Sequence, residues 1–117
     1  MNIEELRTYC LNLKGTSEGF PFDQKTLVFK VMGKMFALID VDDFESINLK
    51  CDPEKAVSLR EMHAGITPGF HMNKSLWNTV SINEDVSEKL IYELIDHSYQ
   101  QVVLKLTKKL QNELQSR

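Results

Sequence analysis

Histidine and cysteine are the side chains with which this chain could bind a metal or act as a nucleophile. The histidines, at positions 63, 71 and 97, are too far apart in sequence to share one helix face as zinc ligands do. Neither Cys10 nor Cys51 belongs to a Cys-x-x-Cys pair, and both fall at apolar positions of their segments. We therefore expect two buried, reduced thiols, no metal or cofactor, and no enzymatic activity.

An acidic turn at 40–43 is the other group of potential ligands. A calcium-binding loop needs a glycine at its bend and a bidentate acid at its end. Glu45 stands where that glycine would be. We expect a solvated turn rather than a calcium site.

The stretch from Ile66 to Ile82 is the part of the chain best suited to binding. It holds the only tryptophan, Trp77, together with His71 and Lys74, and it lies in the longest segment without Asp or Glu. A Pro-Gly pair followed by apolar and β-branched residues predicts a hairpin over 70–82. The position of Trp77 in that hairpin decides what the stretch can bind.

Two hairpin registers fit the pattern, because side chains alternate across a strand. A two-residue loop, Lys74-Ser75, places Trp77 beside Met72 in the core, which is the commoner environment for a single tryptophan. A three-residue loop that includes Leu76 instead puts Phe70 and Val80 in the core. The outer face then consists of His71, Asn73, Trp77 and Thr79. Such a platform suits docking of a partner or base stacking, which contributes about 1–3 kcal/mol per base.

Capping residues and helical spacing predict the helices that surround this stretch. The first helix begins after the cap residue Asn2 and ends before Gly15, which can adopt a positive φ. Asp52-Pro53 starts a second helix. The last helical region, as one helix or two, opens with a capping box at 85–88, and we expect its tail from Lys105 to fray.

Alternation and β-branched residues predict the strands. The expected strands are 20–23, 26–32, 34–39, 46–51 and the two strands of the 70–82 hairpin. Pro21 confines the first of these to an edge, because proline cannot donate to the ladder. In the fourth strand the alternation directs Ile47 and Leu49 inward and Lys50 outward.

The element order is therefore α-β-β-β-β-α-β-β-α. Adjacent strands with helices grouped around them indicate an antiparallel sheet with helices packed on it, the α+β class. The 117 residues, of which 42% are hydrophobic, suit a single domain over 1–117, and we expect a monomer rather than an obligate oligomer. No apolar run approaches the roughly 20 residues of a membrane helix, and the acidic N-terminus differs from an export signal, so we expect a cytoplasmic protein.

The placement of charge is more informative than its sum. The formal net charge of −3 opposes general attraction to nucleic acid. Acids are nevertheless absent from three segments: 24–39, 62–83 and 97–112. Both predicted hairpins consequently carry only positive formal charge, with Lys25, Lys30 and Lys34 on the first and Lys74 on the second. Three or four such lysines on phosphates predict weak binding with a salt slope of about −3 to −4.

Pieces of the sequence resemble the MmcQ/YjbR family of small bacterial proteins. The matching pieces are Phe20-Pro21-Phe22, residues 33–37 (GKMFA), residues 48–53 (NLKCDP), residues 68–74 (PGFHMNK), residues 77–80 (WNTV) and His97-Ser98-Tyr99. They span nearly the whole chain in order. The resemblance implies a frataxin-like (CyaY-like) α+β fold, no known enzymatic activity, and two projecting hairpins compared with a "double wing" DNA-binding module.

Carried onto this sequence, the resemblance makes the hairpins the DNA-binding site. The candidate residues are Lys30, Lys34, His71, Asn73, Lys74 and Trp77. Members of the family often have a basic residue and a histidine before the tryptophan, where this chain has Ser75 and Leu76. The fold resemblance also raises an iron site, but such a site needs an acidic ridge, and the first helix offers only Glu4 and Glu5.

The alternative is a module that binds a protein or a small ligand. It would use the face that carries Trp77 and His71. An exposed aromatic patch without basic neighbours would favour it over the DNA-binding hypothesis.

Overall fold

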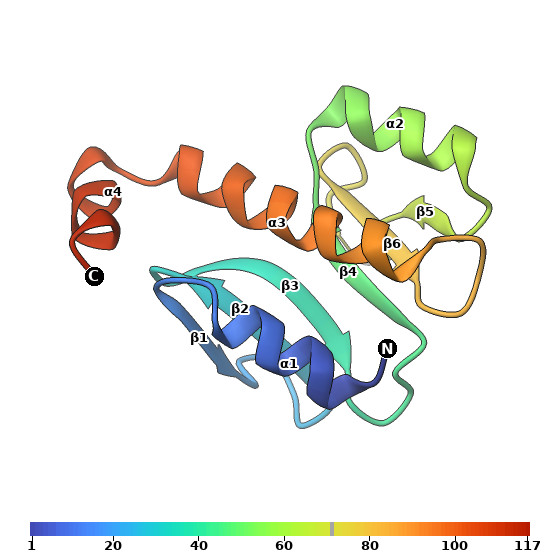
Figure 1. Ribbon diagram of the computed structural model, residues 1–117, viewed down its shortest axis with the longest axis horizontal. Coiled ribbons are helices and arrows are strands. Elements are labelled where there is room, and N and C mark those ends of the chain that lie inside the picture. Colours follow the sequence, from blue (N-terminus) through green and yellow to red (C-terminus); the bar gives the residue numbers. More distant parts are fainter. Residues whose placement is uncertain (71) are drawn as a thin grey trace.

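The computed structural model describes residues 1–70 and 72–117, which form a six-stranded antiparallel sheet with helices on one of its faces (Figure 1). The strands are β1 (Thr16–Gly19), β2 (Thr26–Val31), β3 (Lys34–Asp40), β4 (Ser46–Lys50), β5 (Ile66–Pro68) and β6 (Trp77–Ser81), in the spatial order β1-β2-β3-β4-β6-β5. The helices are α1 (Ile3–Leu11), α2 (Pro53–Met62), α3 (Glu88–Lys105) and α4 (Lys108–Gln115). The predicted α+β class is confirmed.

The main core lies between the sheet and the helices. Strand β2 directs Leu27, Phe29 and Val31 into it, and β4 directs Ile47 and Leu49 into it, as the alternation predicted. The buried side chains of all four helices belong to this one cluster. Figure 1 accordingly shows α1 and α3 lying over the same side of the sheet. We call the other side, which no described helix covers, the open face.

Ser98 of α3 inserts its hydroxyl between two strands of the sheet. Strand β3 has a bulge at Phe36, and β3 and β4 pair only as far as Ala37 and Leu49. One residue further on, where Phe36 and Lys50 would face each other, Ser98 Oγ accepts the Lys50 N–H at 2.8 Å and donates to the Phe36 carbonyl. The hydroxyl is fully buried, so it satisfies two backbone groups that the bulge would otherwise leave unpaired.

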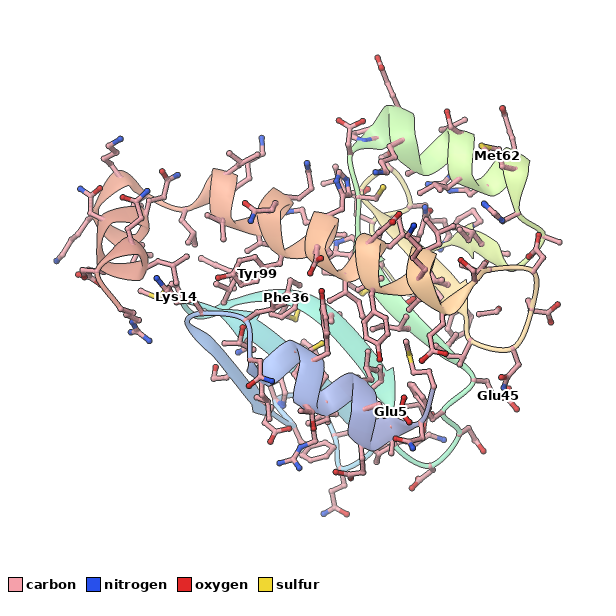
Figure 2. The ribbon with its side chains drawn as sticks, in the orientation of Figure 1. Glu5, Lys14, Phe36, Glu45, Met62 and Tyr99 are labelled. Carbon is pink, nitrogen blue, oxygen red and sulfur yellow. The ribbon has the colours of Figure 1, made fainter. Side chains whose placement is uncertain are left out.

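The neighbours of Ser98 attach α3 to two other segments. His97 Nε2 accepts the Asp52 N–H at 3.1 Å, next to the start of α2, and therefore carries no proton on that nitrogen. The Tyr99 hydroxyl donates to the Lys14 carbonyl, and its ring packs edge-on against Phe36 with centroids 5.5 Å apart. Figure 2 shows Tyr99 on the sheet side of α3, close to Phe36 and Lys14.

One strand prediction needs correction in this part of the fold. The edge strand is β1, at Thr16–Gly19, and not the predicted 20–23 segment. An edge strand that pairs on one side can be polar, and β1 is held to α1 by an ion pair between Glu18 and Arg7. Phe20 and Phe22 lie beyond it and are exposed.

The helix ends also differ from the predictions. Ser87 caps α3, whereas Asp85 accepts the N–H groups of Ala64 and Gly65 and so joins the start of α3 to the turn before β5. These bonds hold the pKa of Asp85 below its ordinary value, the Gly65 N–H contributing most. The tail does not fray: it forms α4, which buries Leu114. No helix among the described residues is long and apolar enough to cross a membrane.

Replacing Ser98 by alanine tests the bridge between β3 and β4. S98A leaves the Lys50 N–H and the Phe36 carbonyl buried without partners, which lowers the free energy of unfolding by about 1–3 kcal/mol. Urea unfolding of S98A and of the control S58A, at an exposed serine of α2, measures the difference. A loss no larger than that of S58A would mean that the two strands pair directly without the hydroxyl.

His97 predicts a pH dependence of stability. Burial, followed by the charge of Lys55, lowers the pKa of His97 below its ordinary value, while Asp52 acts in the opposite direction. The unfolded chain then binds a proton more readily, so stability is fully present above about pH 6.5 and falls as the pH drops below it. Unfolding curves between pH 7.5 and 5 should show a smaller decline for H97Q, whose amide oxygen can still accept the Asp52 N–H. Parallel declines would contradict this role.

Candidate functional site

Trp77 is buried on the open face. Its side chain is 7% exposed and packs with Val28 of β2 and Leu38 of β3, forming a small second core that the helices do not touch. Met35 and Met72 cover this core partly. Of the two alternatives for the tryptophan, the structure has the packed one, although in neither predicted register. A base cannot stack on a ring buried in this way.

The segment before Trp77, described at 69–70 and 72–76, is a folded loop and not the predicted strand; we call it loop 69–76. Strand β5 ends at Pro68, opposite Asn78 of β6. The loop then closes with the Gly69 N–H bonded to the Trp77 carbonyl at 2.8 Å and the Trp77 N–H bonded to the Asn73 carbonyl at 2.9 Å. The hairpin was mispredicted because these bonds, which join loop residues to Trp77 at the start of β6, replace a strand ladder. His71 lies outside the described residues.

The loop also differs from a projecting wing because its polar residues form hydrogen bonds within the protein. Asn73 Oδ1 accepts the Ser75 N–H at 3.0 Å, and Lys74 Nζ donates to the Gly69 carbonyl at 3.0 Å. Arg60 of α2 donates to the Lys74 carbonyl and, through Nε, to the side chain of Asn78 at 2.7 Å. The loop is thus tied to both α2 and β6. Arg60 had no signal in the sequence, because its partners become neighbours only in the fold.

Four lysines gather at one end of the sheet. Lys30 pairs with Met35, and Lys50 pairs with Trp77, the residue that ends the loop of Lys74, so Lys30 and Lys50 lie on the open face. Lys34 follows the Met32-Gly33 turn at the same end, but it pairs with Val31 of the main core and so starts on the helix side. Because Ala37 pairs with Leu49, the Lys34 end of β3 lies beside the Lys50 end of β4. Among the described residues, no ion pair engages Lys30, Lys34 or Lys50. Sequence alternation had directed Lys50 outward without marking it as a site residue.

Carboxylates occupy the opposite end of the open face. Strand β3 ends at Asp40, opposite Thr26, and the turn to β4 carries Asp43 and Glu45. Lys25 lies here and pairs with Asp40 at 3.3 Å and Asp43 at 3.9 Å, so it does not join the other lysines. The hydrogen bond and charge of Asp40 raise the pKa of Lys25 above its ordinary value.

Two acids do lie near the lysine end, at the start of α2. Asp52 accepts the Lys55 N–H as the helix cap, and Glu54 is in the first turn. Both belong to a helix whose buried residues pack on the other side of the sheet. The open face itself is therefore basic at one end and acidic at the other.

A groove of about 620 Å³ lies on the open face toward its acidic end. Phe22 and Phe70 stand at its sides and are 64% and 68% exposed. Phe70 is thus not in the core, where the sequence pattern had placed it. Its backbone N–H is held by Thr79 Oγ1, which in turn bonds Asn48 Oδ1 on the groove floor.

The thiols are structural. Cys10 and Cys51 are both buried and free, as predicted. Burial is the main cause that raises the pKa of Cys10 to about 12 and that of Cys51 to about 11, so neither is a thiolate at neutral pH. Within 1–70 and 72–117 no group of three His, Cys, Asp or Glu side chains is placed to hold a metal ion.

Comparison with known proteins identifies the family. The YjbR family model matches residues 11–101. This chain belongs to the YjbR family. It is similar to the uncharacterized protein YjbR of Escherichia coli K12, with 36% identity over 104 residues that cover 88% of each chain, and to the uncharacterized protein YbdF of Escherichia coli O157:H7, with 36% identity over 91% of this chain and 88% of YbdF.

Solved structures of similar proteins show the same fold. The crystal structure of protein DR2400 of Deinococcus radiodurans, described as a DUF419 domain, has a TM-score of 0.91 at 40% identity and covers 97% of this chain and 87% of its own. A crystal structure from Pseudomonas syringae has a TM-score of 0.71 at 31% identity and covers 86% of this chain and 98% of its own. Neither the names nor the titles of these YjbR relatives state a ligand or a reaction.

The emission of Trp77 tests its placement. As the only tryptophan, it alone reports on the second core of the open face. We expect emission at shorter wavelength than in the urea-unfolded chain and weak quenching by iodide, because the ring is shielded from water. Emission and quenching equal to those of the unfolded chain would place the ring at the surface instead.

Proposed function

We propose that this YjbR protein is a non-enzymatic DNA-binding protein that contacts the phosphate backbone with the basic end of its open face. The observation that carries the proposal is the strand register, which brings Lys30, Lys34, Lys50 and Lys74 to one end of the sheet while the acids of the open face lie at the other. This arrangement offsets the unfavourable net charge of −3, because phosphates can approach one end without meeting the other.

The contacts available define the kind of binding. Lysine is a point charge that meets phosphate oxygens without reading bases. Trp77 is buried, so base stacking does not contribute. Asn73 and Lys74 belong to a loop fixed by its own hydrogen bonds, which limits how far they can reach toward a base. We therefore expect weak, sequence-independent, salt-sensitive binding of duplex DNA by a monomer.

Fluorescence anisotropy with a labelled duplex tests the proposal. Four lysines on phosphates give a slope of log K against log salt of about −3 to −4. K30Q and K50Q, both on the open face, should each weaken binding and reduce the magnitude of the slope by about 1. The control K89Q makes the same charge change at an exposed position in the first turn of α3 and should bind as the wild type does.

Absence of salt-dependent binding at micromolar protein would exclude the proposal, and an equal loss in all three variants would exclude the assigned surface. Gel analysis of the DNA after incubation should recover it intact. Cleaved or modified DNA would contradict the non-enzymatic part.

A further inference from the structure

The groove on the open face combines apolar sides with an acidic end. Phe22 comes from the loop between β1 and β2, and Phe70 from loop 69–76, so two segments distant in sequence present exposed aromatic rings to one hollow. Large apolar side chains that flank a concave surface are typical of ligand-binding sites. The volume of about 620 Å³ falls within the range of small-molecule sites, which is about 300–1,000 Å³.

The floor of the groove consists of residues that are held in place by packing and by hydrogen bonds. Met35, Leu38 and Met72 supply its apolar part and rest on the second core around Trp77. Asn48 and Thr79 supply its polar part and are bonded to each other through Asn48 Oδ1. Within the described part of the chain the Asn48 amide nitrogen has no partner, so its two N–H groups remain as donors beside the groove. The floor therefore offers both apolar contact and hydrogen bonds.

Charge decides which ligands can enter. The carboxylates of Asp40, Asp43 and Glu45 line one end, and Lys25 is the one cation that pairs with them among the described residues. Three negative charges against one positive charge leave this end negative. An anionic ligand would be repelled, and so would a second copy of the same groove. Exposed aromatic rings, by contrast, attract ammonium groups through their faces.

We propose that this groove binds a small organic cation: an aromatic or aliphatic body held between Phe22 and Phe70, with an ammonium group directed to the Asp43 and Glu45 end. The chemistry that defines the ligand is thus an apolar portion joined to a positive charge. This inference goes beyond the proposed DNA binding and does not depend on it, because the positive charge of the ligand is directed to the acidic end of the open face, whereas phosphates require the lysines. It assigns named residues to the binding of a small ligand on the open face.

Three probes with the same naphthylmethyl body and different charge test the inference. They are 1-naphthylmethylammonium, 1-naphthylmethanol and 1-naphthylacetate, each titrated into the full chain while backbone amide shifts are recorded. The cation should bind about tenfold or more tighter than the anion, with the neutral alcohol between them. The shifted amides should be those of Asn48, Thr79 and the neighbouring groove residues. Equal affinity for cation and anion, or shifts confined to the helix side, would overturn the inference.

Matched variants test the assigned residues. F22A removes one side of the groove, whereas F20A removes an exposed phenylalanine from the same loop that does not line it. E45Q neutralises the acidic end, and E61Q makes the same change on exposed α2. F22A and E45Q should weaken the cation about fivefold or more, and F20A and E61Q less than about twofold. All four positions are exposed, so the amide spectrum should confirm that each variant is folded. Equal effects of F22A and F20A would overturn the assignment.

Discussion

The contact on which the rest of this fold depends is the insertion of Ser98 between β3 and β4. The bulge at Phe36 separates the two central strands, and one hydroxyl on α3 satisfies a backbone group from each of them. Its neighbours His97 and Tyr99 fix the start of α2 and the end of the α1 region to the same helix. Three consecutive residues thereby fasten the helices to one side of the sheet. The His-Ser-Tyr motif consequently has a structural role, and the other side of the sheet is left uncovered.

The uncovered side is stabilised by its own small core and not by a helix. Trp77, Val28 and Leu38 bury one another across three strands, and the methionines around them meet the groove floor. This placement explains why a large aromatic residue occurs on a strand near the sheet edge without being a surface contact. Its contribution to binding is indirect, since it supports the residues that a ligand or partner would touch.

The register of the strands gives the open face its polarity. The turn between β2 and β3 and the loop before β6 lie at one end with their lysines, while the turn between β3 and β4 carries its acids to the other. A chain with a net charge of −3 can in this way present a basic surface and an acidic groove on one face. The two proposed sites would recognise ligands of opposite charge, and they meet at loop 69–76, which carries both Lys74 and Phe70.

The elements that local patterns define could be predicted from the sequence. The strands around Gly33, the alternation of Ile47 and Leu49, and the caps at Asn2 and Asp52 depend on residues close in the chain, and the structure has them where expected. The segments that failed depend on tertiary partners instead. Strand β1 is polar because, as an edge strand, it pairs with a single neighbour. Loop 69–76 has the residue pattern of a strand, although its hydrogen bonds are made within the loop and to α2 and β6.

The same distinction applies to the candidate sites. Acid-free segments pointed to Lys34 and Lys74, but no sequence signal could show that Lys50 joins them or that Lys25 is paired with Asp40. Those facts follow from which strand ends lie together. The exposed Phe70 was missed for the same reason, because an apolar residue in a supposed strand is by default assigned to the core.

The central claim is that DNA approaches the basic end of the open face. Mapping of backbone amide shifts during titration with a duplex at low salt tests it most directly. We expect perturbations at the turn around Gly33, at Lys50 and in loop 69–76, with none in the acidic turn 40–45 and reversal on addition of salt. Perturbations centred on the acidic turn or on the helices, or none at all, would contradict it.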